Sequence, residues 1–334
     1  MKSTFSVLFL CFFLVSCGEE KTVETDEAVE TEKTIQARAE AGDADAQYEL
    51  AVMYASGQGV PEDSAEAVKW LREAAEQGSA EGQIGLGVMY VRGQGVPQDY
   101  TEGVKWIRMA AERGYVEGLF TLGLMHAGGD GVPKDDVEAA KWYRMAAEQG
   151  NVSAQVHLGL LYSLGKKVPQ NYAEASKWFR RAAEQGDVSA QIHLSRMYED
   201  GDGVPRDSAE AAKWVRKAAE QGSAASQFAL SLKYAGGDGL PKDDVEAVKW
   251  LSKAAEQGSN GAQTAMGDRY AEGDGLPQDY IKAYMFYNLA AVGGSEFCRR
   301  RRDRFEDELT KEQIAEGQKL TRKWLERKAK EKGE

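Results

Sequence analysis

The residues best suited to metal or acid–base chemistry are the three histidines, His126, His157 and His193. His157 and His193 lie 36 residues apart, so a repeating fold could bring them near each other. Neither a cysteine nor a third histidine accompanies them, although structural and catalytic zinc sites take three or four such ligands. His126 stands where tyrosine stands at the same spacing elsewhere, which indicates a packed ring. We therefore predict structural histidines, with no metal site and no cofactor.

A second candidate is Cys298, which four arginines follow at positions 299–302. Their charge would favour the thiolate form of the cysteine. No histidine lies nearby in the sequence to act as a base, so we predict a cysteine without catalytic function. The arginine run is also typical of nucleic-acid or acidic-lipid patches. Acidic residues follow it at helical spacing and indicate an ion-paired helix instead: Asp303, Glu306, Asp307 and Glu308.

Composition and motifs exclude several classes of function. The 334 residues carry a net charge of −12, which argues against a nucleic-acid binder, because binding of phosphates needs a basic surface. No phosphate loop, nucleophile elbow or zinc motif is present. The carboxylates Asp63, Glu66 and Glu76 recur along the chain, and a residue present in every unit usually serves that unit. We predict no catalytic residue.

The elements that position these residues follow a period of 36. It is seen in all seven prolines, from Pro61 to Pro277, and in six of the seven tryptophans, from Trp70 to Trp250, with Phe286 in the seventh position. An internal period of 20–50 residues indicates a repeat architecture. Seven units cover residues 42–293.

Each unit has the pattern of two helices. In the first unit, Asp43 is a suitable N-cap, apolar residues recur at helical spacing, and Gly57 ends the first helix. The turn contains Gly59 and Pro61, and Asp63 is a suitable cap for the second helix. No segment has the alternating pattern of a strand, so the sequence predicts an all-α fold.

The repeated pattern resembles the Sel-one-like repeat (SLR), a relative of the tetratricopeptide repeat. It reads A-x-x-x-L-G-x-x-Y-x-x-G-x-G-V-P-x-D-x-x-E-A-x-K-W-x-x-x-A-A-E-Q-G and is clearest in residues 82–114 and 154–186. The resemblance implies an α-solenoid of seven 36-residue helix-turn-helix repeats in a right-handed superhelix. Residues 294–334 would form a C-terminal helical cap, whose last helix opens at the capping box Thr310-x-x-Gln313.

Two positions depart from this pattern. Lys167 replaces the second turn glycine of the other units, so either this residue is strained in a left-handed conformation or the turn of the fourth unit differs. In the seventh unit, Met285-Phe286 replaces the Lys-Trp pair.

The resemblance also places the first helices on a concave face that would bind a protein or peptide. Alignment with tetratricopeptide repeats puts a partly apolar stripe on this face, with Phe120 and Phe228 as its expected anchors. Part of the stripe could instead be ordinary packing between first helices. The predicted binding residues are Tyr48, Val52, Ile84, Val88, Phe120, Leu124, Val156, Leu160, Ile192, Arg196, Phe228 and Leu232. We expect a monomer that contacts no nucleic acid.

The N-terminal residues predict export and lipid attachment. Residues 1–16 have the apolar run of a signal peptide, and Leu14-Val15-Ser16-Cys17 resembles the bacterial lipobox. That resemblance implies a cell-envelope protein whose lipidated Cys17 is its membrane anchor. Gly18, rather than Asp, follows the cysteine, which resembles an outer-membrane address. Residues 17–41 are acidic and lack aromatic residues, so we expect a disordered tether.

These features favour a non-enzymatic scaffold anchored in the envelope. One alternative is a cell-wall-related or β-lactam-hydrolysing enzyme, since cysteine-rich relatives of this repeat are described with such activity. Those relatives have one disulfide per repeat, whereas this chain has three cysteines in all. The other alternative is a structural spacer.

Overall fold

The computed structural model describes residues 26–293 and 296–332. The described residues divide into two compact units, with the boundary between residues 171 and 172, and each unit is described by itself. The predicted signal peptide and Cys17 lie outside the described residues. The described residues contain α-helices and no strand, which confirms the all-α prediction.

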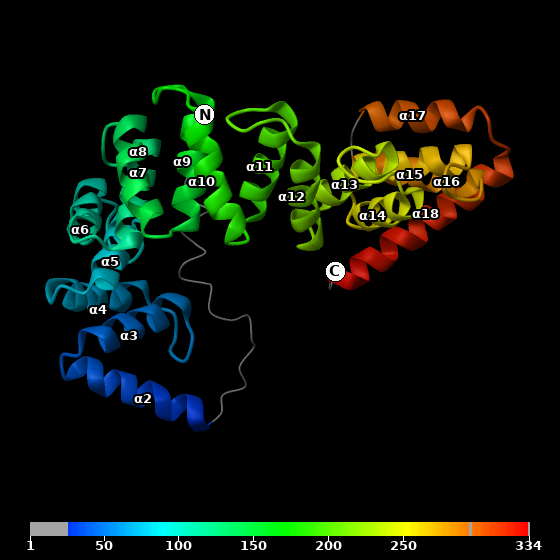
Figure 1. Cartoon of the computed structure of the whole chain (residues 1–334). Coiled ribbons are helices and arrows are strands. Elements are labelled where there is room, and N and C mark those ends of the chain that lie inside the picture. The colour runs from blue at the N-terminus through cyan, green and yellow to red at the C-terminus, as the bar shows by residue number, and fades with distance from the viewer. Residues whose placement is uncertain (1–25, 294–295, 333–334) are drawn as a thin grey trace. The chain divides into compact units, whose positions relative to one another are not determined.

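Figure 1 shows the succession of helices along the chain. The first unit contains α2 (Asp26–Glu40), α3 (Ala44–Ser56), α4 (Ser64–Glu76), α5 (Ala80–Arg92), α6 (Tyr100–Glu112), α7 (Val116–Gly128), α8 (Asp136–Glu148) and α9 (Val152–Leu164). The second contains α10 (Tyr172–Glu184), α11 (Val188–Asp200), α12 (Ser208–Glu220), α13 (Ala224–Gly236), α14 (Asp244–Glu256), α15 (Asn260–Glu272), α16 (Tyr280–Val292), α17 (Glu296–Glu306) and α18 (Lys311–Lys332).

Helix caps define each hairpin. At the start of α3, the Asp43 carboxylate accepts hydrogen bonds from the backbone N–H groups of Asp45 and Ala46, as predicted. Gly57 ends the helix in the left-handed conformation, with φ 70°. The backbone N–H of Asp63 then donates to the carbonyl of Tyr54, and its carboxylate caps α4. Aspartate caps recur at later second helices, as at Asp99 and Asp135, whereas the caps of the first helices vary and Tyr115 before α7 makes no side-chain cap bond.

The turn of the fourth repeat differs from the others, as one of the two sequence interpretations proposed. Elsewhere the second turn glycine has positive φ, as in Gly95 at 68°, where a Cβ atom would lie 2.0 Å from the carbonyl oxygen of Ser64. Among the described residues, none other than glycine has positive φ, so Lys167 lies outside the left-handed region. The strain considered for Lys167 is therefore absent.

Small residues on the first helices make room for large ones on the second helices. A Cβ atom at Gly123 on α7 would lie 2.6 Å from the Tyr143 ring of α8. A Cβ atom at Gly267 on α15 would lie 2.5 Å from the Tyr287 ring of α16. Both tyrosines are 1% exposed. The helices of a hairpin therefore approach closely, with large rings filling the core between them.

The structure corrects the prediction of a disordered tether over residues 17–41 for residues 26–40, while residues 17–25 lie outside the described residues. Residues 26–40 form α2, and Ile35 and Ala39 pack against Ala46 and Leu50 of α3. Ile35 and Ala39 stand 36 residues before Leu71 and Ala75, which pack in the core at the end of the first repeat. Helix α2 thus occupies the place of a second helix before the first repeat, because α3 needs an apolar partner on that side.

The predicted cap is present as α17 and α18, and α18 packs against α16. Its capping box is formed: Thr310 N–H donates to Gln313 Oε1 at 2.9 Å, and Gln313 N–H donates to Thr310 Oγ1 at 3.3 Å.

Candidate binding surface

The histidines pack against neighbouring side chains, and His126 on α7 is buried, as predicted from its register. His157 contacts the rings of Phe120 and Tyr143 at centroid distances of 5.4 and 5.2 Å, and His193 stacks on Phe179 at 4.8 Å. Burial lowers the pKa of His157 and that of His193. Within residues 26–293 and 296–332, no group of three or more His, Cys, Asp or Glu side chains is arranged to hold a metal ion.

Cys298 and the arginines beside it also take structural roles. Cys298 is 5% exposed and its sulfur lies 3.5 Å from Thr264 Oγ1. Arg301 pairs with Asp268 at 2.5 Å and Arg302 with Asp303 at 2.6 Å, while Arg300 pairs with Glu296. The run is therefore ion-paired, although mainly with carboxylates other than those that the sequence suggested.

In the first unit, the predicted concave stripe is partly core. Val88, Phe120 and Val156 are 6, 7 and 9% exposed. The Phe120 ring packs against Tyr143 at 5.8 Å and against His157. The prediction that Phe120 is an exposed anchor is therefore wrong, since the rings of α8 and α9 cover it.

The other predicted residues of this unit are half-buried: Tyr48, Val52, Ile84, Leu124 and Leu160. Burial raises the pKa of Tyr48, with a further contribution from the carboxylates of Glu81 and Glu117. Glu81 and Glu117 therefore place negative charge near Tyr48, which is half-buried.

In the second unit, the predicted stripe is more accessible. Leu232 is 55% exposed on α13, and Phe228 lies one turn earlier on the same helix, half-buried. A Cβ atom at Gly261 would lie 3.1 Å from the Phe228 ring, so α15 supports one side of that ring. Ile192 is half-buried and Arg196 is exposed on α11. These four residues, Ile192, Arg196, Phe228 and Leu232, are called the α11–α13 surface.

A row of buried glutamines, which the sequence analysis missed, holds the first helices in place. Gln191 Nε2 donates to the carbonyl of Ala183 at 3.2 Å, and its Oε1 accepts from Gln221 at 2.9 Å. Gln227 repeats both contacts, with Ala219 and Gln257. The available signal was a glutamine in six of the seven repeats: Gln47, Gln83, Gln155, Gln191, Gln227 and Gln263. Because an unpaired buried amide is costly, these bonds fix where α11 and α13 lie.

Arginine–tyrosine pairs add a second link between successive helices. Arg216 of α12 donates to the hydroxyl of Tyr234 on α13 at 2.7 Å, and Arg180 of α10 to that of Tyr198 on α11 at 2.6 Å. Each guanidinium also lies near the face of its tyrosine ring. The α11–α13 surface is therefore supported by a rigid array of polar contacts.

No helix in the described part of the chain has the length and apolar character needed to span a bilayer. A model of the Sel1 repeat matches residues 44–79, 80–115, 116–151, 152–187, 188–223, 224–259 and 261–295. No match is found among curated proteins.

Two solved structures are similar over most of their length. A Sel1 repeat protein from Oxalobacter formigenes is 35% identical, with 90% of this chain and 85% of that chain covered and a TM-score of 0.66. A protective antigen present in uropathogenic Escherichia coli strains, described as displaying an SLR fold, is 29% identical, with 96% and 91% covered and a TM-score of 0.53. Seven matched repeats and these two folds agree, so the chain belongs to the Sel1 repeat family.

Proposed function

We propose that this protein is a non-enzymatic scaffold that binds a protein or peptide on the α11–α13 surface. The observation that carries the proposal is the exposed Leu232 one turn from Phe228, whose half-buried ring packs beside Gly261 of α15. An apolar side chain fixed on a rigid helix loses little entropy when a partner covers it. Arg196 at the edge of this surface would add charge selectivity and affect mainly the association rate.

The test is capture of partners by the full-length protein from solubilised bacterial envelopes. Leu232→Glu and Phe228→Ala should each reduce the captured partner about tenfold or more. Val245 on α14 is 77% exposed and provides the matched control, so Val245→Glu should leave capture unchanged. Equal capture by all three variants would contradict the assignment of this surface.

We further propose that the protein is lipid-anchored through Cys17, in the outer membrane and facing the periplasm. The support is the lipobox-like sequence that ends at Cys17, followed by Gly18. Labelled palmitate should enter the native protein and not Cys17→Ser, because stable attachment needs acyl chains. Label that persists in the serine variant would contradict this anchor.

The enzyme and spacer alternatives make different predictions. A scaffold should leave nitrocefin intact, whereas measurable hydrolysis that is lost on unfolding would favour the β-lactam enzyme. A spacer should capture no partner with any variant, including Val245→Glu. Helix caps and ion pairs within the second helix account for the recurring carboxylates at the positions of Asp63 and Glu66, which supports the non-enzymatic proposal.

A further inference from the structure

A cavity of about 560 Å³ lies at the N-terminal end of the first unit, between α2, α3 and α4. Its volume is within the roughly 300–1,000 Å³ of small-molecule pockets. An aromatic ring, three carboxylates and two amides line it: Trp70, Glu40, Glu73, Glu76, Gln47 and Gln77. The chemistry of this wall suits a cation, since both a tryptophan face and carboxylates attract positive charge.

The fifth repeat contains residues equivalent to those that line this cavity. Five of these six residues have a counterpart of the same type and register in the fifth repeat: Glu184, Gln191, Trp214, Glu220 and Gln221. The glutamine contact is also the same, since Gln77 donates to Gln47 at 2.7 Å and Gln221 to Gln191 at 2.9 Å. The sixth position differs, because Lys217 replaces Glu73. The Lys217 ammonium lies 4.3 Å from the centre of the Trp214 ring.

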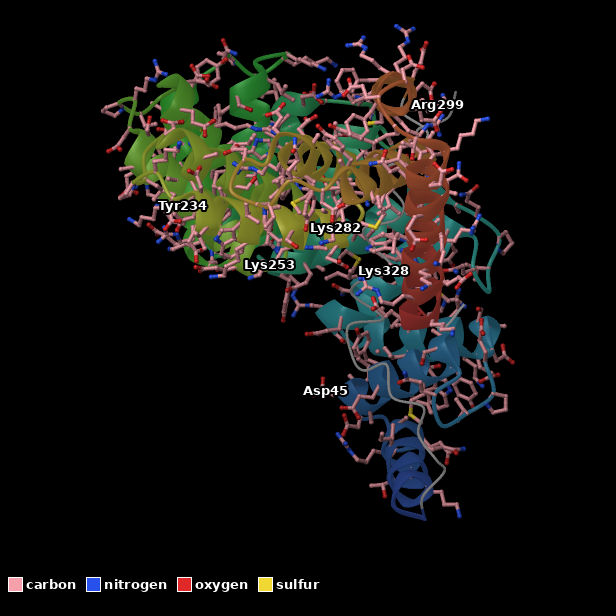
Figure 2. The ribbon with its side chains drawn as sticks, turned by 90° about the vertical axis from the view of Figure 1, so that its right-hand side faces the viewer. Asp45, Tyr234, Lys253, Lys282, Arg299 and Lys328 are labelled. Atoms are coloured by element: carbon pink, nitrogen blue, oxygen red, sulfur yellow. The ribbon has the colours of Figure 1, made fainter. Side chains whose placement is uncertain are left out.

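In the sixth repeat, a lysine also lies over the tryptophan ring. Lys253 stands in the position of Glu73, and its ammonium lies 4.1 Å from the centre of the Trp250 ring. Figure 2 labels Lys253 on its helix together with Lys328 of α18. In these two repeats the residue three positions after the tryptophan is therefore a lysine that lies over the ring, whereas in the first repeat it is the carboxylate Glu73.

Glu76, a carboxylate that lines the cavity, has a counterpart in a later repeat that forms ion pairs. Glu256 is the counterpart of Glu76, five repeats later. It accepts an ion pair from Arg327 of α18 at 2.7 Å and from Lys328 at 3.5 Å. Basic side chains from a neighbouring segment thus bind this carboxylate position within the same chain. Among the described residues, no ion pair involves Glu73 or Glu76.

We infer that the cavity at Trp70 binds a basic side chain, a lysine ammonium or an arginine guanidinium, of a protein partner. The cation lies over the Trp70 ring, as Lys217 lies over Trp214, and Glu73 replaces the internal lysine with a carboxylate that pairs with the incoming charge. This inference rests on the proposed function for the identity of the ligand as part of a protein. The cavity itself is tested without any partner.

A neighbouring lysine does not block this site. Lys69 lies 5.5 Å from the Trp70 ring centre and pairs with Glu66 at 3.2 Å. In the fifth repeat, Lys213 holds the same position at 5.9 Å while Lys217 occupies the ring at 4.3 Å. The Trp214 ring therefore has two lysine ammonium groups near it, so Lys69 leaves room for a second cation at Trp70.

The probe is n-butylammonium, with n-butanol as the uncharged control of similar shape. The full chain is labelled with 5-fluorotryptophan, and the Trp70 fluorine signal is assigned from its loss in Trp70→Phe. Butylammonium should shift the Trp70 signal in a saturable manner, and butanol should not. High salt should weaken the effect, because Glu40, Glu73 and Glu76 are exposed to solvent.

Glu73→Lys is the matched variant, because it gives the first repeat the residue that the fifth and sixth repeats carry. It should retain the melting temperature and weaken butylammonium binding about tenfold or more. Equal shifts with butanol, or undiminished binding by Glu73→Lys, would overturn the inference. Glu73→Lys should also reduce partner capture. If it weakens butylammonium binding but leaves capture unchanged, a protein side chain is not the ligand, and the α11–α13 surface remains testable by Leu232→Glu.

Discussion

The first and second units use the same hairpin but differ at one position of their second helices. Three residues after the repeat tryptophan, the first unit has Glu73, Met109 and Met145. The second unit has Arg181, Lys217 and Lys253, and each of these cations lies over the tryptophan of its own repeat, at 4.6, 4.3 and 4.1 Å. A basic residue at this position therefore places a cation closer to the tryptophan ring than Lys69 or Lys105 does in the first unit, where each lies 5.5 Å from the ring centre.

The polarity of a second core position varies between repeats. Met89 and Met125 are buried in the first unit, but Lys233 holds this position in α13. Lys233 is 5% exposed and pairs with Glu199 at 2.8 Å and with Asp238 at 3.3 Å. In the second unit, Met197 of α11 is also buried at this position, whereas Lys233 of α13 has an ion-pair network there. The difference shows that the hairpin geometry does not depend on the polarity of this residue.

The largest expected difference is between Phe120 and Phe228, which occupy one register in the two units. Phe120→Ala should lower the free energy of unfolding by about 3–5 kcal/mol, because it opens a cavity beside Tyr143 and His157. Phe228→Ala should cost at most about half of that, since its ring is half-buried. Urea melts followed by circular dichroism measure both. Equal losses would show that the two units do not differ at this register.

The next effect concerns the ion pairs of Lys233. Glu199→Gln should lower the free energy of unfolding by about 1–2 kcal/mol, because the buried ammonium loses one of its two carboxylates. Lys233→Met restores the residue type of the first unit and should be neutral or stabilising. Thermal melts check both variants. A strongly destabilised Lys233→Met would mean that the second unit needs its charge.

A smaller effect separates two buried tyrosines at one register. The Tyr287 hydroxyl donates to Asp268 at 2.7 Å, whereas the Tyr143 hydroxyl has no hydrogen-bond partner among the described residues. Tyr287→Phe should cost about 1 kcal/mol, while Tyr143→Phe should be neutral or slightly stabilising. Denaturant midpoints of the two variants test this order, and a greater loss for Tyr143→Phe would reverse it.

The smallest effect is the pH dependence from His157. Burial lowers the pKa of His157 in the folded state, so the unfolded imidazole, with a pKa near 6.5, takes up a proton first as the pH falls. The free energy of unfolding should therefore decrease by up to about 1 kcal/mol between pH 7.5 and 5.5. His157→Gln should flatten this slope in urea melts, and an unchanged slope would exclude His157 as its source.

The repeat period predicted most of the fold because it depends on local rules. Aspartate caps, left-handed glycines and helical spacing each act within one repeat, and Asp43, Gly57 and Thr310 have the predicted contacts. The helix over residues 26–40 was missed because its acidic composition concealed two apolar residues, Ile35 and Ala39, that continue the period backward. Its folding depends on contact with α3 and is not visible in local composition.

The candidate site was predicted less well, because exposure depends on residues distant in sequence. Phe120 and Phe228 hold equivalent positions, but Phe120 is covered by Tyr143 and His157, whereas Phe228 faces Gly261. The cavity at Trp70 is formed by three helices and becomes informative only when its copies at Trp214 and Trp250 are compared. Sequence periodicity aligned these residues but did not predict which faces remain open.

The most direct test of the scaffold account is site-specific photo-cross-linking in whole cells. A photoreactive residue is placed at position 232 on α13, at position 245 on α14, or at the buried position 120. The account predicts a discrete higher-mass adduct with a protein partner from position 232, and none from positions 245 and 120. An adduct from position 245 and none from 232 would contradict the assignment of binding to the first helices of the second unit.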